Sequence, residues 1–267
     1  MQVKAKDYQE HPLFNDLATY SKFYDHLADL NMHWVTQGVK NILNIDTYVF
    51  NSIQGTLESI FDILKKGRIN DAYTLLRKYY DSAIINLYSK LYLDDHFGFD
   101  NYIVEKINNW IEGKETIPGF EKMSKYIINS KKVAEITELI YNGGDFKKSS
   151  LESIRQRCNE HTHYLYYHTL LLNNSEVYIE ERIDLLNKFR ADLREIFILH
   201  IGYLFFFSDN YMMSSDYIDS LDMGEKPERD SEYWVAPFVQ DIFDGVLKKF
   251  RPDIVEAIKG NTQMQLS

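Results

Sequence analysis

Apolar residues recur every three to four positions along most of the chain, which is the spacing of one face of an α-helix. This pattern predicts long helices over residues 14–43, 47–66, 71–95, 151–172 and 176–209, and an amphipathic helix over residues 237–250. Shorter, more polar helices are expected at residues 102–111, 120–129 and 132–141. Only 12 glycines and 5 prolines interrupt the chain. We therefore expect an all-α fold, a multi-helix bundle.

The same pattern gives no reason to divide the chain. There is no repeat of fixed period and no shift in composition. We expect residues 1–267 to form a single all-helical domain, with its core in residues 47–96 and 151–209 and with the helix 237–250 docked on the body or on a second copy. The most apolar segment, residues 196–207, is shorter than the roughly 20 residues that span a bilayer. It predicts a buried helix and no membrane insertion.

Charge and cysteine content narrow the function classes. The formal net charge of −10 disfavours broad affinity for nucleic acid, although a small basic site remains compatible with it. A single cysteine and an N-terminus without an apolar run fit a cytoplasmic protein. No glycine-rich phosphate loop, Gly-x-Ser-x-Gly elbow, His-Glu-x-x-His pair or cysteine-based metal motif occurs. Most nucleotide hydrolases, hydrolytic triads and zinc peptidases are thereby excluded at the level of motifs.

The segment 151–172 carries the strongest candidate chemistry. At 100° per residue its apolar stripe is centred on Cys158. One flank of the stripe carries Arg157, His161, Tyr164 and His168, and the other carries Arg155, Asn159, His163 and Tyr166. Each flank thus places a permanently charged guanidinium near an imidazole that titrates around neutrality. Such flanks favour a functional site, with hydrogen-bonding structural side chains as the alternative.

Residues 155–163, Arg-Gln-Arg-Cys-Asn-Glu-His-Thr-His, resemble the Arg-x(4–6)-His signature of the HEPN superfamily, helical bundles common among toxin and phage-defence ribonucleases. Five residues separate Arg155 from His161, and five separate Arg157 from His163. The family often has a polar residue directly after the arginine, whereas Cys158 follows Arg157 here. Which pair is functional is therefore left open, with Arg157 and His163 as the first candidates and Arg155 and His161 as the second.

The resemblance implies an HEPN-like core with extra helices and a metal-independent endoribonuclease that needs no cofactor. A neutral histidine would take the proton of a ribose 2′-hydroxyl, the arginine would stabilise the phosphate, and Asn159 would position either group. The products would be a 2′,3′-cyclic phosphate and a 5′-hydroxyl. The resemblance also implies RNA as substrate, a homodimer with a shared site, a toxin or antiphage role, and a neutralising or activating protein partner.

Two other interpretations remain. Glu160, His161, His163 and His168 are competent metal ligands, but His163 points away from the other two histidines and the usual i, i+4 pair is absent. We therefore expect no metal. The chain is alternatively a non-catalytic helical module that binds a protein. If an arginine and a histidine converge at an exposed groove, the enzyme is favoured. If both side chains are fully hydrogen-bonded within one protomer, the interaction module is favoured.

Overall fold

A computed structural model describes residues 2–33, 45–98, 101, 103–142, 148–225 and 234–267, without the side chains of residues 32, 33 and 148–150. Within these ranges the protein is helical throughout, and its β-structure is limited to two isolated bridges. The predicted all-α multi-helix bundle is confirmed. Residues 34–43 of the helix predicted over residues 14–43 lie outside the described residues.

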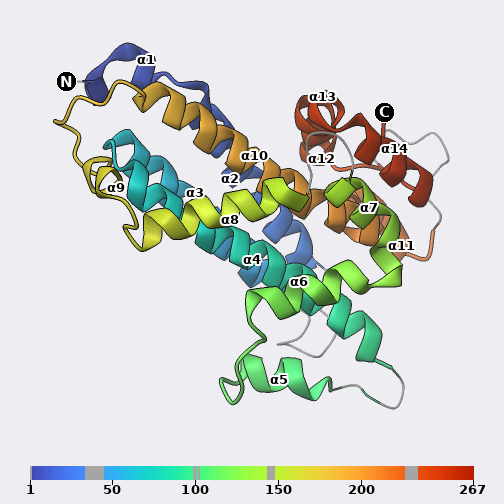
Figure 1. The fold of residues 1–267 in the computed structure, drawn as a ribbon. Helices are drawn as coiled ribbons and strands as arrows, with labels where there is room; N and C mark the ends of the chain where they lie inside the picture. The colour runs from blue at the N-terminus through green and yellow to red at the C-terminus, as the bar shows by residue number, and fades with distance from the viewer. Residues whose placement is uncertain (1, 34–44, 99–100, 102, 143–147, 226–233) are drawn as a thin grey trace.

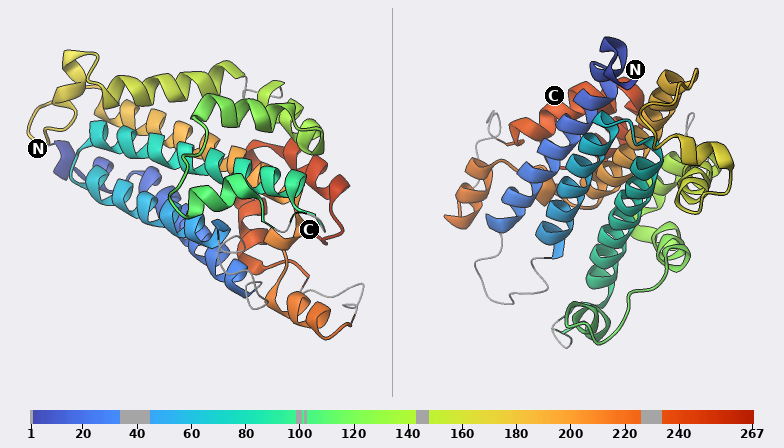
Figure 2. Two further views of the ribbon diagram at one scale, coloured as in Figure 1. Left: turned by 90° about the horizontal axis from the view of Figure 1, so that it is seen from below. Right: turned by 90° about the vertical axis from the view of Figure 1, so that its left-hand side faces the viewer.

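Four long helices form the body: α2 (Pro12–His33), α3 (Ile45–Lys65), α4 (Ile69–His96) and α10 (Arg182–Phe207). Helices α2, α3 and α4 pack side by side, and α10 lies against α2 and α4 (Figures 1 and 2). The outer surface of α4 is covered by α8 (Lys148–Thr162) and α6 (Phe120–Asn129). The shorter helices are α1 (Lys6–Gln9), α5 (Glu105–Ile111), α7 (Ala134–Asn142), α9 (Tyr167–Leu171), α11 (Ser215–Asp222), α12 (Pro237–Ile242), α13 (Lys248–Phe250) and α14 (Pro252–Asn261).

The second half of α10 is the centre of the core. Every residue from Ile196 to Phe206 is buried. Phe197 stacks on Tyr20 with 3.8 Å between ring centroids, and Phe205 packs on Phe243 at 5.5 Å. The buried helix expected for residues 196–207 is thereby confirmed. Among the helices described, none combines the length and apolarity needed to cross a bilayer.

The helix predicted over residues 151–172 is two helices, and that prediction was wrong. Helix α8 runs antiparallel to α4 and ends at Thr162, close to the position where α4 begins at Ile69. Beyond this point a straight α8 would have no helix to pack against. The chain instead turns through Tyr164, whose φ of 48° is left-handed, and enters α9. After α9 the chain comes back to the start of α4, where the backbone amide of Ile69 donates to the carbonyl of Leu172 at 3.1 Å. The last residues of the predicted apolar stripe are therefore buried by this return of the chain and not by a longer α8.

Three polar residues near the starts of α3 and α4 lie inside these helices and do not cap them. Asp46 is the second residue of α3, and Asn70 and Asp71 lie in the first turn of α4. Their side chains bridge to other segments: Asn70 to α8, Asp71 to Asn173, and Asp46 to α4 and Tyr211. Each of these side chains thus binds a group from a distant segment, whereas a capping side chain would bind a backbone amide of its own helix.

The C-terminal region docks on the chain's own body. Residues 237–250 form α12, a π-helical turn (Phe243–Leu247) and α13 as one continuous segment. The ring of Phe238 lies 5.6 Å from that of Phe23 on α2. The chain then continues into α14, which the sequence pattern did not indicate, as it did not indicate α11. The long helix predicted from residue 176 begins only at Arg182.

A chain of hydrogen bonds passes through the core around His200. The imidazole Nε2 lies 2.9 Å from Oδ1 of Asn86, whose amide nitrogen donates to Asp46 at 2.8 Å. Nδ1 lies 2.7 Å from the hydroxyl of Tyr24, which is 2.9 Å from the hydroxyl of Tyr79. Since an amide oxygen only accepts, Nε2 of His200 is the donor and Nδ1 the acceptor. Burial lowers the pKa of His200 to about 3, so the ring is neutral.

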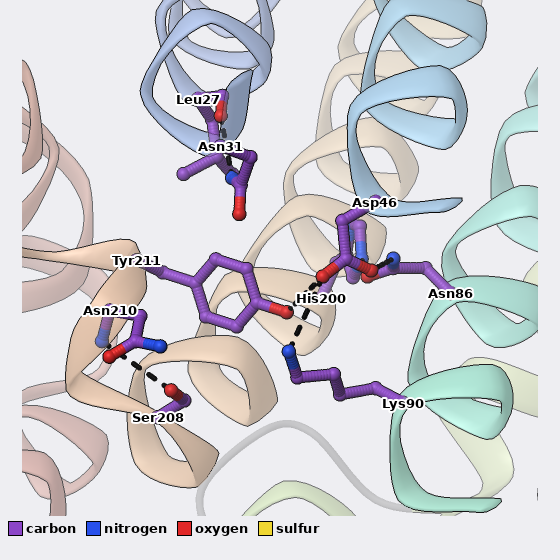
Figure 3. A network of polar contacts seen from close by, with 9 residues as sticks. All are labelled: Leu27, Asn31, Asp46, Asn86, Lys90, His200, Ser208, Asn210 and Tyr211. Atoms are coloured by element: carbon purple, nitrogen blue, oxygen red, sulfur yellow. Dashed lines mark hydrogen bonds and ion pairs between the residues drawn. The ribbon is translucent and has the colours of Figure 1, made fainter. Parts of the chain in front are cut away.

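The outer end of this chain is the carboxylate of Asp46, as Figure 3 shows. Tyr211 donates to Oδ2 of Asp46 at 2.7 Å, and Nζ of Lys90 lies 3.5 Å from the same oxygen. The half-buried carboxylate therefore links α3 and α4 to the 3₁₀ turn (Asp209–Tyr211) after α10. One connected set of hydrogen bonds thus joins five segments: α2, α3, α4, α10 and the 3₁₀ turn.

Replacing Asn86 with leucine is expected to lower the free energy of unfolding by about 2–4 kcal/mol, because it leaves the buried Nε2–H of His200 without an acceptor and removes the hydrogen bond to Oδ1 of the half-buried Asp46. Urea denaturation at neutral pH measures the loss. The matched control is Gln54→Leu, which removes an exposed hydrogen bond to Glu58. Equal stability losses in both variants would contradict the role of the network.

Candidate functional site

The two flanks of α8 face different neighbours. Arg157 and His161 face α10 and the start of α4, whereas Arg155 faces the middle of α4 and the start of α6. The helical geometry predicted for this segment accounts for the separation, because Arg157 and His161 are four residues apart and share a flank. Figure 1 shows α8 lying across α4, with α9 at its far end.

Arg157 is held by the carboxylate of Asp192 on α10. Its Nε donates to Oδ2 at 2.9 Å, and its Nη2 donates to Oδ1. Asp192 is buried, and Tyr73 also donates to its Oδ2, at 3.3 Å. Burial alone would lower the pKa of Arg157, but the hydrogen bonds and charge of Asp192 outweigh it and raise the pKa. The third nitrogen, Nη1, makes no hydrogen bond to the residues that the structure describes, and the side chain is 23% exposed.

His161 lies one helical turn further along. Its Nδ1 is 2.9 Å from Oδ1 of Asn70, and its ring stacks on Tyr73 at 4.2 Å with an interplanar angle of 5°. The amide oxygen accepts, so Nδ1 carries the proton and Nε2 carries the lone pair. Burial, with the positive charges of His168, Lys188 and Arg157, lowers the pKa of His161 to about 4. The ring is thus neutral at pH 7, with Nε2 as a free acceptor.

A second cluster with the same composition occurs around the first half of α10. Arg190 binds Asp16 through Nε and Nη2, at 2.5 and 3.2 Å, and His11 lies 3.1 Å from the amide oxygen of Asn187. There, however, the second ring nitrogen of His11 accepts a hydrogen bond from the backbone amide of Leu13. The histidine of this cluster is therefore closed, while Arg190, like Arg157, donates only through Nε and Nη2 to the residues that the structure describes.

Buried histidines in the described part of the chain are His11, His161 and His200. Both ring nitrogens are hydrogen-bonded in His11 and in His200. His161 alone among these three has a ring nitrogen without a hydrogen-bond partner among the described residues. This difference distinguishes His161 from the two histidines whose ring nitrogens are both hydrogen-bonded within the fold.

Arg155 is held by contacts with other helices of the fold. Its Nη1 lies 2.7 Å from Oδ1 of Asp81, and its guanidinium stacks over Phe120 at 3.5 Å from the ring centroid. Asp81 lies 11 residues after Asn70 on α4, a distance of about 16 Å along the helix. Within one chain, Arg155 and His161 are therefore anchored at well-separated points. Asp81 also forms an ion pair with Arg77, four residues earlier on α4, at 3.8 Å.

The remaining predicted residues are His163 and Asn159. His163 is exposed, directly after the last residue of α8, and its backbone amide donates to the carbonyl of Asn159 at 2.9 Å. The side-chain Oδ1 of Asn159 is buried and accepts no hydrogen bond from the described residues. The structure thus places Arg157 and His161 on the same flank of α8 and leaves His163 exposed beyond the end of this helix.

Other chemistries find little support at this site. Cys158 is buried, and burial raises the pKa of its thiol to about 12, so it stays protonated. Throughout the described ranges, no three side chains of His, Cys, Asp or Glu come together as potential metal ligands.

Three residues of the site were not identified from the sequence: Asn70, Tyr73 and Asp192. Asn70 directly precedes the helix predicted over residues 71–95, where a polar residue is ordinarily a helix cap. Asp192 lies in the charged half of its helix, but apolar residues three positions before it and four positions after it indicate an inward-facing acid. A buried acid requires a cation, and that requirement was the signal for its pairing with an arginine.

The pH dependence of stability tests the environment of His161. Its folded pKa of about 4 lies below the ordinary value of 6.5, so the unfolded chain binds the proton first. The stabilising contribution is complete above the unfolded pKa and is lost as the pH falls toward the folded pKa. Between about pH 7.5 and pH 5, wild type should lose about 2 kcal/mol more than His161→Asn in urea denaturation. His96→Asn, at an exposed histidine, should lose as much as wild type, and a wild-type slope in His161→Asn would contradict the assignment.

Comparison of the chain with family models, with curated proteins and with solved structures found no match. None of these comparisons bears on the resemblance of residues 155–163 to HEPN proteins. The function has to be inferred from the geometry around Arg157 and His161.

Proposed function

We propose that this chain is an HEPN-like, metal-independent endoribonuclease in which Arg157 binds the scissile phosphate and His161 is the general base. The observation that carries the proposal is a pair of unused nitrogens on adjacent turns of α8: Nη1 of Arg157 and Nε2 of His161. The pair takes one member from each of the two pairs that the motif suggested.

The anchoring of Arg157 suits phosphate binding. A guanidinium presents several donors in one plane, and Asp192 fixes that plane by binding two of the three nitrogens. The third nitrogen then needs no reorganisation to donate to a phosphoryl oxygen that gains charge in the transition state. The positive charge of Lys188, close enough to influence His161, adds to the attraction for a phosphate.

The tautomer of His161 suits proton transfer. Asn70 holds the proton on Nδ1, so Nε2 can accept the proton of a ribose 2′-hydroxyl. The 2′-oxygen forms a bond to phosphorus, and the bond from phosphorus to the 5′-oxygen breaks. The imidazolium, a strong acid in this environment, returns the proton to the leaving 5′-oxygen. The products are a 2′,3′-cyclic phosphate and a 5′-hydroxyl, and no external reactant is consumed.

The biological setting in this proposal follows the HEPN resemblance. The chain would act on cellular or phage RNA in the cytoplasm, as a homodimer whose two copies complete the site, in a toxin or antiphage system. A protein partner would neutralise or activate it. The lack of a described bilayer-spanning helix and the single cysteine agree with this setting.

A non-catalytic protein-interaction module is the second candidate, and two observations favour it. Arg155 and Arg157 both bind carboxylates of the same chain. In addition, a groove of about 530 Å³ between α3, α4 and α5 is lined largely by apolar side chains, among them Tyr48, Val49 and Trp110. The acidic net charge also suits a protein partner better than RNA.

Cleavage of a mixed pool of structured and unstructured RNA in EDTA distinguishes the two candidates. Wild type should produce cyclic-phosphate ends. His161→Asn should lose about 10²–10⁴-fold in rate because the base is gone, and Arg157→Lys about 10²–10³-fold because the free nitrogen is gone. The matched controls are His11→Asn and Arg190→Lys, which alter the cluster around Arg190 and should retain wild-type rates.

The same assay includes His163→Ala. Loss of cleavage in that variant, with full activity in His161→Asn, would reject His161 and return the base to His163. Absence of cyclic-phosphate ends in every sample would reject the ribonuclease and leave the interaction module.

The rate of cleavage should depend on pH in a distinctive way. Because the pKa of His161 is lowered to about 4, the free base is fully available at pH 7 and remains so as the pH falls to about 5. Single-turnover rates should therefore be flat over this range and fall below about pH 4.5, provided that circular dichroism shows a folded protein. A decline already centred near pH 6.5 would point to an exposed histidine as the base.

A further inference from the structure

An exposed group of tyrosines adjoins the candidate site. Tyr164, Tyr166 and Tyr167, here called the tyrosine platform, are 46%, 53% and 76% exposed. Three of the five exposed tyrosines in the described part of the chain thus fall within four consecutive positions. Most other tyrosines lie in the core or pack against it. The concentration of bare rings directly after His161 needs an explanation other than folding.

The backbone at the platform is also unfavourable. Tyr164 adopts a left-handed φ of 48°, a conformation that costs energy for any L-residue other than glycine because its Cβ comes close to the following carbonyl oxygen. This turn directs the chain away from α4 and leaves the three rings in solvent. None of their hydroxyls hydrogen-bonds to a described residue, and Tyr166 stacks on the exposed His168 at 5.6 Å and 18°. Strain and exposed aromatic surface therefore coincide at a single turn.

The charge around the platform differs from that of the whole protein. Although the chain has 40 acidic residues and a net charge of −10, none of residues 161–175 is acidic. A surface hollow of about 530 Å³, which α9 enters only with Leu170, has two cations and one acid in its lining: Lys66, Arg68, Leu170, Asn173, Asn174, Ser175 and Glu176. Lys188 adds a further positive charge near His161. The surroundings are therefore suited to a polyanion.

Aromatic rings with nearby cations fit unpaired nucleotides better than a duplex. Every base has a flat face that stacks on a tyrosine, but base pairing in a helix keeps those faces covered. Lysine and arginine beside the rings attract the phosphates between successive bases. A protein partner would use the apolar rings but would have no need of the cations.

We propose that Tyr164, Tyr166 and Tyr167 stack on unpaired bases of an RNA strand whose phosphodiester reaches Arg157 and His161, and that Lys66 and Arg68 bind its backbone. This inference rests on the proposed function, and it makes the substrate class unpaired RNA rather than duplex. The platform lies directly after α8, so a strand stacked there extends along the Arg157 flank of that helix.

Binding can be measured separately from cleavage. All variants carry His161→Asn so that the RNA stays intact, and fluorescence anisotropy in EDTA follows a labelled 12-nucleotide unpaired RNA and the same sequence in a duplex. The single strand should bind at least tenfold more tightly. Tyr166→Ala with Tyr167→Ala should weaken single-strand binding by about ten- to a hundredfold. Tyr166→Phe with Tyr167→Phe keeps the rings and should bind normally.

The matched control is Tyr48→Ala, which removes a tyrosine that is 67% exposed on α3 and should leave binding unchanged. Equal affinity for strand and duplex, normal binding by the double alanine variant, or no RNA binding at all would overturn the platform. Binding with this pattern but no cleavage by wild type would retain the platform and reject the ribonuclease. Cleavage that depends on His161 but not on the tyrosines would retain the ribonuclease and reject the tyrosine platform.

Discussion

The enclosure of α10 is the constraint on which the rest of the structure depends. Other helices surround most of this helix, so a polar side chain on its buried faces has no access to bulk water and needs a partner within the protein. Three such side chains occur: Arg182, Asp192 and His200. Arg182 is satisfied by Gln2 and by backbone carbonyls, among them those of Gly67 and Val177. One arginine thereby fixes the N-terminus, the turn between α3 and α4, and the segment before α10.

The other two polar groups, Asp192 and His200, explain why α4 carries buried polar residues among its apolar ones. Asn86 of α4 satisfies His200, and Tyr73 of α4 shares Asp192 with Arg157. Asn70, near the start of the same helix, orients His161. The core network around His200 and the candidate site around Asp192 therefore have the same origin: each supplies a hydrogen-bond partner to a buried polar group of α10. They differ in outcome because His200 and Asn86 are fully enclosed, whereas the site lies where α8 ends and the covering of α4 is incomplete.

The same physics explains what could be predicted from the sequence. Helical periodicity and the apolar run at residues 196–207 correctly predicted an all-α bundle with a buried helix at its centre, because these are local properties. The end of α8 was not predictable in this way, because Thr169 and Leu172 continue the apolar spacing although the chain has turned back. The roles of Asn70 and Asp192 were missed for a related reason. Each depends on a partner about 35 to 91 positions away, which no local pattern specifies.

The ion pair between Arg157 and Asp192 is compatible with either proposed function, so the pair itself does not decide between them. The cluster of Arg190, Asp16 and His11 has the same components and shows what such an arrangement is when it only supports the fold: the histidine is hydrogen-bonded at both nitrogens. At Arg157 the equivalent histidine keeps one nitrogen open. A purely structural site gains nothing from that opening, because an enclosed hydrogen bond would stabilise it further. The open nitrogen, beside a fixed guanidinium and the tyrosine platform, is therefore the feature that favours a site for chemistry on RNA.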